Sequence, residues 1–135
     1  MPLTDDALNE LLGGRHVAVL ATIDRHGRPH QAPVWYLWRD GVALIVTERA
    51  SQKARNIGRN AAVSLCIDTK TPPYSVAVIQ GEAVESQADF QQTRRALWEH
   101  YVGVEQAREV LAARPTDTAI SVLFEIVPRR IVSSG

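Results

Sequence analysis

The sequence predicts a mainly β protein with short helices, whose antiparallel strands close into a barrel. Six segments carry the alternating or continuously apolar pattern of strands, and clusters of Gly, Pro and Asp separate them. Apolar residues occupy both faces of some segments, as in residues 17–23, which favours a closed barrel over an open sheet. A chain of 135 residues holds one core, so residues 1–135 are expected to form a single domain.

The first half of the chain is predicted to hold one helix and three strands. Thr4 is suited to cap a helix over residues 4–13, which Gly13 and Gly14 end. The predicted strands cover residues 16–23, 30–38 and 42–47. The segments DRHGRP and RDG between them have turn composition, so the three strands form two successive hairpins.

The second half is predicted to add two helices and three strands. In chain order they are a helix over residues 51–59, strands over 61–68 and 74–85, a helix over 87–114 and a closing strand over 118–132. Pro72 and Pro73 break the chain between two of the strands, because proline cannot donate to a ladder. Gly81 indicates a bulge or a close approach of another backbone.

The overall charge and the lone cysteine exclude several classes of protein. Fifteen basic and fifteen acidic residues leave the chain neutral, which argues against a nucleic-acid or anionic-membrane binder. Cys66 has no partner for a disulfide. The N-terminal segment lacks the pattern of a signal peptide, and no apolar run approaches the roughly 20 residues that span a bilayer, so a cytoplasmic protein is expected.

No catalytic motif is present in the sequence. Nucleophile elbow, CxxC, HExxH and Walker A patterns are all missing, and the four histidines lack the spacing of metal ligands, so no metal site is predicted. A protein of this kind can rely on a bound cofactor for its chemistry.

The segment SQKARNIGRN, residues 51–60, is the first candidate site. Ser51 is suited to cap a helix, and the first-turn amides with the nearby cations would suit a phosphate. Thr47 brings a hydroxyl to the same corner. The alternative is a solvated helix face that binds nothing.

The segment HQAPVWYLW, residues 30–38, is the second candidate. Its aromatic side chains point to both faces of the predicted strand, and Pro33 removes one ladder donor. Such a strand could lie beside a flat heteroaromatic ligand. Alternatively, its rings fill the core and a subunit interface.

The order of four segments resembles that of the pyridoxamine 5′-phosphate oxidase-like, flavin-binding split-barrel superfamily. They are VAVLATIDRHGRPHQAPVWY, VTERASQKARN, NAAVSLCID and YSVAVIQGEAVE, which together cover roughly residues 15–86. The resemblance implies a six-stranded antiparallel Greek-key split barrel that forms a homodimer with a cofactor at the interface. The longer C-terminal region of the true oxidases has no counterpart here, which argues against oxidation of the vitamin phosphate.

The resemblance also implies roles for particular residues. Residues lining the cofactor ring would be Ala32, Pro33, Val34, Trp35 and Tyr36, with Ser75 and Val76 from a neighbouring strand. Residues holding the phosphate would be Thr47, Ser51, Gln52 and Lys53, supported by Asn56. Gln52 stands where the family often has an arginine. His30 and Tyr74 are candidates for contacting the substrate.

The implied function is hydride transfer between a flavin-type cofactor and a small organic molecule. The run KARN and the strand YSVAVIQGEAVE are more similar to the branch that uses the deazaflavin coenzyme F-420, so this cofactor is favoured over FMN. Arg55 and Arg59 could meet its acidic oligoglutamate tail. The alternative is a carrier or sensor of the same fold that binds the cofactor without turnover.

Overall fold

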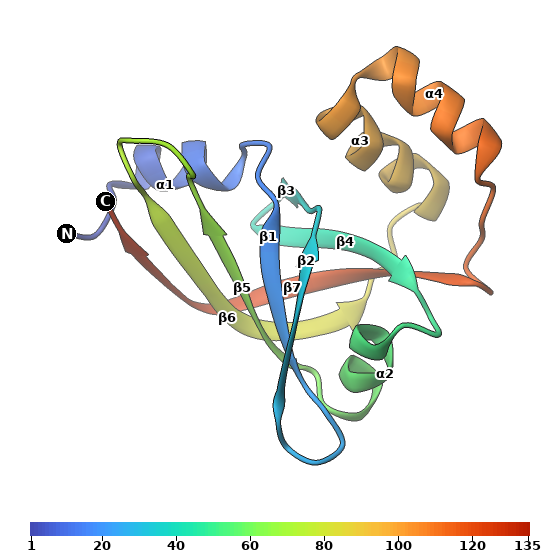
Figure 1. The fold of residues 1–135 in the computed structure, drawn as a ribbon, viewed down its shortest axis with the longest axis horizontal. Helices are drawn as coiled ribbons and strands as arrows, with labels where there is room; N and C mark the ends of the chain where they lie inside the picture. The colour runs from blue at the N-terminus through green and yellow to red at the C-terminus, as the bar shows by residue number, and fades with distance from the viewer.

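Seven antiparallel strands form one curled sheet in the computed structural model, which describes all of residues 1–135 (Figure 1). The strands are β1 (Ala18–Ile23), β2 (Pro29–Val34), β3 (Leu37–Arg39), β4 (Val42–Glu48), β5 (Ala62–Asp68), β6 (Val76–Glu85) and β7 (Ser121–Ser134). The helices are α1 (Asp5–Leu12), α2 (Gln52–Arg59), α3 (Phe90–Val102) and α4 (Val104–Ala113). The prediction of a mainly β fold with short helices is confirmed.

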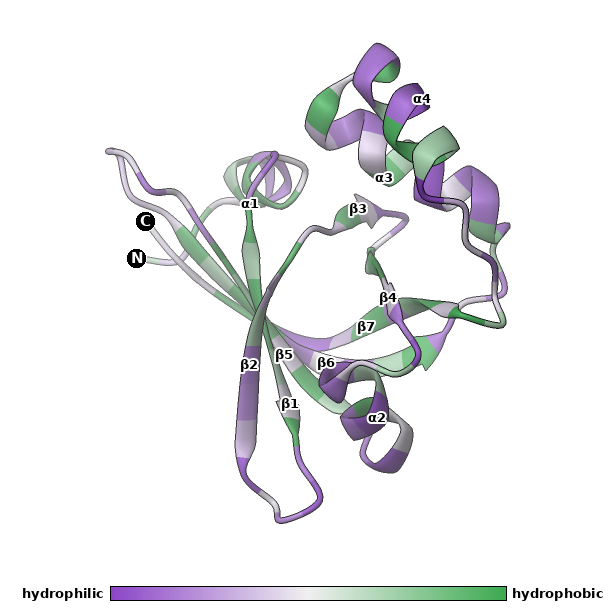
Figure 2. Ribbon diagram, turned by 45° about the vertical axis from the view of Figure 1, so that its right-hand side comes forward, coloured by the Kyte–Doolittle hydropathy of each residue, from purple (hydrophilic) through white to green (hydrophobic).

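The predicted count of six strands is wrong, because segment 30–38 divides into two strands at Trp35 and Tyr36. β2 pairs only with β1 and β3 only with β4, and the sheet order is β2-β1-β5-β6-β7-β4-β3. β2 and β3 are therefore the two edges of the sheet, and the chain joins them without a ladder. The expected closed barrel is a curled sheet that stays open between these edges (Figure 2).

The core lies inside the curl of the sheet. Nineteen buried residues form its main cluster, to which α1 contributes Leu11 and Leu12, and α2 contributes Ala54 and Ile57. In β1 the buried residues alternate with half-buried ones, so residues 17–23 are not buried on both faces.

Two other strands are buried on both faces. β4 and β7 carry a second cluster of Leu44, Phe90 and Leu123 on their outer side, where Phe90 begins α3.

The single helix predicted over 87–114 is two helices, because Gly103 has φ +85° between α3 and α4. No helix is both long and apolar enough to cross a membrane.

The close approach predicted at Gly81 is confirmed. The ladder between β6 and β7 shifts register between Gln80 and Gly81, and a Cβ at Gly81 would lie 2.0 Å from the carbonyl oxygen of Val127. Only a residue without a side chain allows β7 to pass this closely.

We expect Gly81→Ala to lower the free energy of unfolding by about 2–3 kcal/mol, because the added methyl forces two backbones apart. The matched control is Gly58→Ala in α2, where a Cβ meets no atom within 4 Å. There alanine should raise stability by about 0.5–1 kcal/mol through helix propensity. Urea denaturation of both variants measures the difference, and equal effects at the two positions would contradict the close approach.

Candidate functional site

The first turn of α2 lies at the end of β4, as the sequence predicts. The hydroxyl of Ser51 accepts a hydrogen bond from the amide of Ala54 at 3.2 Å, and Thr47 Oγ1 lies 3.1 Å from Ser51 Oγ. The Ala54 amide is therefore not available to a ligand. The amides of Gln52 and Lys53 remain at the positive end of the helix, where an anion is stabilised.

Asn56 is the hydrogen-bonding centre of α2. Its side chain is fully buried, and its amide group donates to Thr22 Oγ1 of β1 at 3.0 Å. Its carbonyl oxygen accepts from Gln52 at 2.7 Å and from Arg59 at 3.0 Å. With all of these partners, Asn56 can support a ligand only indirectly, by orienting Gln52 and Arg59.

A hollow of about 550 Å³ opens between α2 and the β1–β2 turn. We call it the basic hollow; it is lined by Asp24, Arg25, His26, His30, Gln52, Arg55 and Arg59. None of its three arginines forms an ion pair with a carboxylate. Three guanidinium groups against one carboxylate leave the hollow at a net +2 with its histidines neutral, which favours an anion.

The only carboxylate of the basic hollow belongs to the turn itself. Asp24 accepts hydrogen bonds from the amides of Arg28 at 2.9 Å and His26 at 2.8 Å. The bond from Arg28 is the main cause that lowers the pKa of Asp24, so this side chain is ionised at neutral pH. Its role is to shape the turn that carries Arg25 and His26.

His30 supplies an unsatisfied polar atom beside the arginines. It lies opposite Thr22 on the neighbouring strand, and its Nδ1 is buried without a hydrogen-bond partner. A buried polar atom of this kind favours an additional partner, which an anionic ligand in the basic hollow would provide. Lys53, by contrast, is half-buried, forms no ion pair and does not line this hollow.

A second hollow, of about 410 Å³, lies at the other end of β2. We call it the apolar hollow; it is lined by Val17, Pro33, Val34, Trp35 and Trp98. Three of these belong to the segment predicted to line a cofactor ring, and none of the five is titratable. Ala32 precedes them in β2 and is half-buried opposite Leu20.

Tyr36 follows these residues but faces the core. Its side chain is fully buried, and its hydroxyl donates to the carbonyl oxygen of Leu12 at 2.8 Å. Its peptide is held by Tyr101 of α3: the Tyr36 amide donates to the Tyr101 hydroxyl at 3.1 Å, and that hydroxyl donates to the carbonyl oxygen of His16 at 2.7 Å. Burial raises the pKa of both phenols, so both stay protonated near neutral pH.

Tyr74, Ser75 and Val76 lie apart from both hollows. They line a third hollow, of about 280 Å³, together with Asp68, Thr69, Ser134 and Gly135 near the termini. β5 runs from the end of α2 towards this hollow, and six residue steps separate Ala62 from Asp68, about 20 Å of extended strand. One chain therefore does not bring Ser75 and Val76 to α2.

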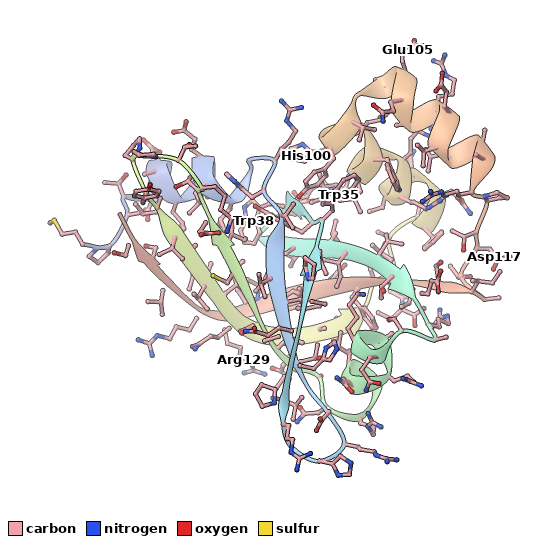
Figure 3. All side chains as sticks on the ribbon, in the orientation of Figure 1. Trp35, Trp38, His100, Glu105, Asp117 and Arg129 are labelled. Atoms are coloured by element: carbon pink, nitrogen blue, oxygen red, sulfur yellow. The ribbon has the colours of Figure 1, made fainter.

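Several residues of the two main hollows were missed from the sequence. Arg25 and His26 stand in a turn whose only signal was its charge, DRHGR. Trp98 lies more than sixty residues after the end of β2 in sequence, and nothing local indicates where its helix docks. Figure 3 labels Trp35 where the sheet faces α3, and the rings of Trp35 and Trp98 have centroids 4.9 Å apart.

The comparison with protein families matches this architecture. The profile of the family described as "Pyridoxamine 5'-phosphate oxidase" matches residues 4–131, nearly the whole chain. The chain therefore belongs to the pyridoxamine 5′-phosphate oxidase family, with its flavin-binding split-barrel fold. No curated protein sequence matches the chain.

Three solved structures illustrate the likeness. The conserved hypothetical protein Rv2991 from Mycobacterium tuberculosis has a TM-score of 0.80 at 24% identity, covering 97% of this chain and 84% of its own. An FAD-binding protein from Mesorhizobium loti has a TM-score of 0.73 at 17% identity, covering 98% and 95%. A structure described as an F420 reductase has a TM-score of 0.66 at 22% identity, covering 91% and 94%. At these identities the likeness establishes the fold alone.

We expect Tyr101→Phe to destabilise the protein by about 1–3 kcal/mol, because it leaves the part-buried amide of Tyr36 without its acceptor. Tyr74→Phe is the matched control: this residue is 66% exposed, and the change should stay within about 0.5 kcal/mol. Thermal and urea unfolding of both variants compare them. A Tyr101→Phe protein as stable as the wild type would show that the hydroxyl does not hold the peptide of Tyr36.

Proposed function

We propose that the protein is an oxidoreductase that transfers a hydride between a bound flavin-type cofactor and a small organic molecule. The observation that carries the proposal is the position of the basic hollow and the apolar hollow at the two ends of β2. His30 and Pro33 are three residues apart, about 10 Å along an extended strand, and their side chains point to opposite faces of it. Because β2 is an edge strand, a ligand that reaches both hollows would pass around its free edge. A ligand with an anionic end and a flat uncharged ring has the same division.

The anionic end of the cofactor is assigned to the first turn of α2. Thr47 and Ser51 supply hydroxyl groups, the amides of Gln52 and Lys53 supply donors, and the ammonium of Lys53 adds charge. Asn56 keeps Gln52 and Arg59 in place through its hydrogen bonds. The Nδ1 of His30 adds a hydrogen-bonding atom at the edge of the basic hollow.

The ring is assigned to residues 32–36, with Pro33, Val34 and Trp35 at the wall of the apolar hollow. β2 is an edge strand, so backbone groups on its free side can bond the polar edge of a ring. When bound, the cofactor would supply the hydride chemistry. The chain would orient the two reactants and exclude water from an apolar wall.

Coenzyme F-420 is the favoured cofactor, and FMN is the alternative. The phosphate of FMN would be served by the first turn of α2 alone, which leaves Arg25, Arg55 and Arg59 without an anion. The acidic tail of F-420 would occupy the basic hollow and neutralise its charge. The structures that share the fold include one described as an F420 reductase and one described as an FAD-binding protein, which supports a flavin-type cofactor in general.

Titration of the purified protein with FMN and with F-420, followed by absorbance and fluorescence, tests the proposal. We expect micromolar binding of F-420 and weaker binding of FMN. Lys53→Ala should weaken binding by about 1.5–3 kcal/mol, the contribution of a charge-assisted hydrogen bond. Lys70→Ala is the control, since Lys70 is the only other lysine and pairs with Asp68 on the surface.

Two results would count against the proposed site. Failure of both cofactors to bind would remove the central assignment. Equal cofactor affinities of the Lys53→Ala and Lys70→Ala proteins would indicate that α2 is a solvated helix that does not bind the cofactor.

A carrier or sensor that binds the cofactor without turnover is the second candidate. It is favoured by one observation: no lining residue of the apolar hollow can act as an acid or a base. Assays of the cofactor-loaded protein with small enones and quinones separate the two functions. Binding without any turnover across such acceptors would support the carrier.

The proposed site also calls for a second copy of the chain. Ser75 and Val76 lie three strand positions from β2, about 14 Å across the sheet, so they would reach the ring bound at β2 only from a partner chain. The outer face of the sheet offers a surface for that partner. Cross-strand neighbours form an apolar row there: Pro33, Val19, Cys66, Val78 and Val132.

We expect the protein to be a homodimer in which this row is buried, and Val132→Asp to dissociate it. Val132 is 45% exposed in the single chain, and a carboxylate at a buried interface is costly. Val104→Asp at the start of α4 is the control, since this residue is 55% exposed and lies away from the row. Light scattering of the three proteins measures their masses. A monomeric wild type would remove the interface.

A further inference from the structure

We propose that α3 supplies a wall of the ring-binding site, with Trp98 in direct contact with the flat ring of the cofactor. This inference rests on the proposed function and adds to it a residue outside the segments that resemble the family. Trp98 is half-buried and lines the apolar hollow beside Pro33, Val34 and Trp35.

The neighbours of Trp98 hold the wall in place. The rings of Trp35 and Tyr101 are stacked, with centroids 4.5 Å apart and an interplanar angle of 1°. Trp98 meets Trp35 edge to face, at 4.9 Å and 75°. The hydroxyl of Tyr101 is in turn fixed to the backbone of His16 and Tyr36. The packing leaves Trp98 with a partly exposed ring in a set orientation, which suits a planar ligand.

The composition of the apolar hollow indicates what it takes. No lining residue carries a charge, the hollow is shallow and open to solvent with a volume of about 410 Å³, and Val17, which directly precedes β1 beside β2, is 50% exposed. The three arginines of the basic hollow lie at the far end of β2. A ligand that passes around the free edge of β2 and reaches both hollows would put its uncharged ring against Trp98.

A purely structural role for Trp98 makes a different prediction. In that case Trp98 only fastens α3 to Trp35, and its replacement would lower stability without a selective effect on the ring. The test therefore needs affinity, stability and a probe of the Trp98 ring itself.

The experiment measures the dissociation constants of F-420 and FMN for Trp98→Leu, Trp98→Phe and Trp38→Leu, with a thermal melt of each free protein. We expect Trp98→Leu to weaken binding roughly five- to tenfold, the effect of one aromatic contact. Trp98→Phe should restore most of the affinity. Trp38→Leu is the matched control on β3, and it should bind like the wild type.

A second measurement does not depend on removing Trp98. The chain has three tryptophans, so a Trp35→Phe/Trp38→Phe variant reports on Trp98 alone. Acrylamide quenching of its emission should fall when either cofactor saturates the protein, because the ring covers the indole.

The results separate this inference from the proposed function. If the wild type binds a cofactor but neither the affinity of Trp98→Leu nor the quenching of Trp98 changes, the wall is wrong and the proposed function stands. If the wild type binds neither F-420 nor FMN, the proposed function fails and the inference with it.

Discussion

The peptide of Tyr36 is the point on which the sheet depends, because two strands at opposite edges meet there. Outside a ladder, a part-buried amide needs another acceptor, and the hydroxyl of Tyr101 provides it. The same hydroxyl holds the carbonyl oxygen of His16 just before β1. α3 thus provides a hydrogen-bond partner for a peptide that lies outside any ladder, and it fixes Trp35 by stacking. Trp35, held in this way, lines the apolar hollow.

The neutral overall charge hides a local imbalance. Elsewhere on the chain, four ion pairs join acidic and basic side chains. The arginines of the basic hollow instead donate hydrogen bonds to uncharged side chains: Arg55 to Gln52, Arg59 to Asn56 and Arg25 to His26. Such an arrangement is repulsive by itself and is relieved by a bound anion. Because Asn56 links α2 to Thr22, the cations keep their positions relative to β1 and β2.

Local signals in the sequence predicted much of the fold and part of the site. The cap at Ser51, the alternation in β5 and the close approach at Gly81 each follow from chemistry within a few residues. The break at Trp35 was missed because a strand pattern does not say which neighbours it pairs with. Trp98 and Arg25 were missed for a related reason. Trp98 reaches the apolar hollow only because a helix distant in sequence docks there, and Arg25 reaches the basic hollow only because of where its turn lies.

The two open edges of the sheet are poor templates for further strands. Pro29 and Pro33 lie in β2, where each removes a donor, and β3 at the other edge has only three residues. A chain that resists growth at its edges can leave its curl open without recruiting strands from other molecules into fibres. Self-association of the chain is thereby directed to the faces of the sheet, and on a face the side chains decide which molecules fit.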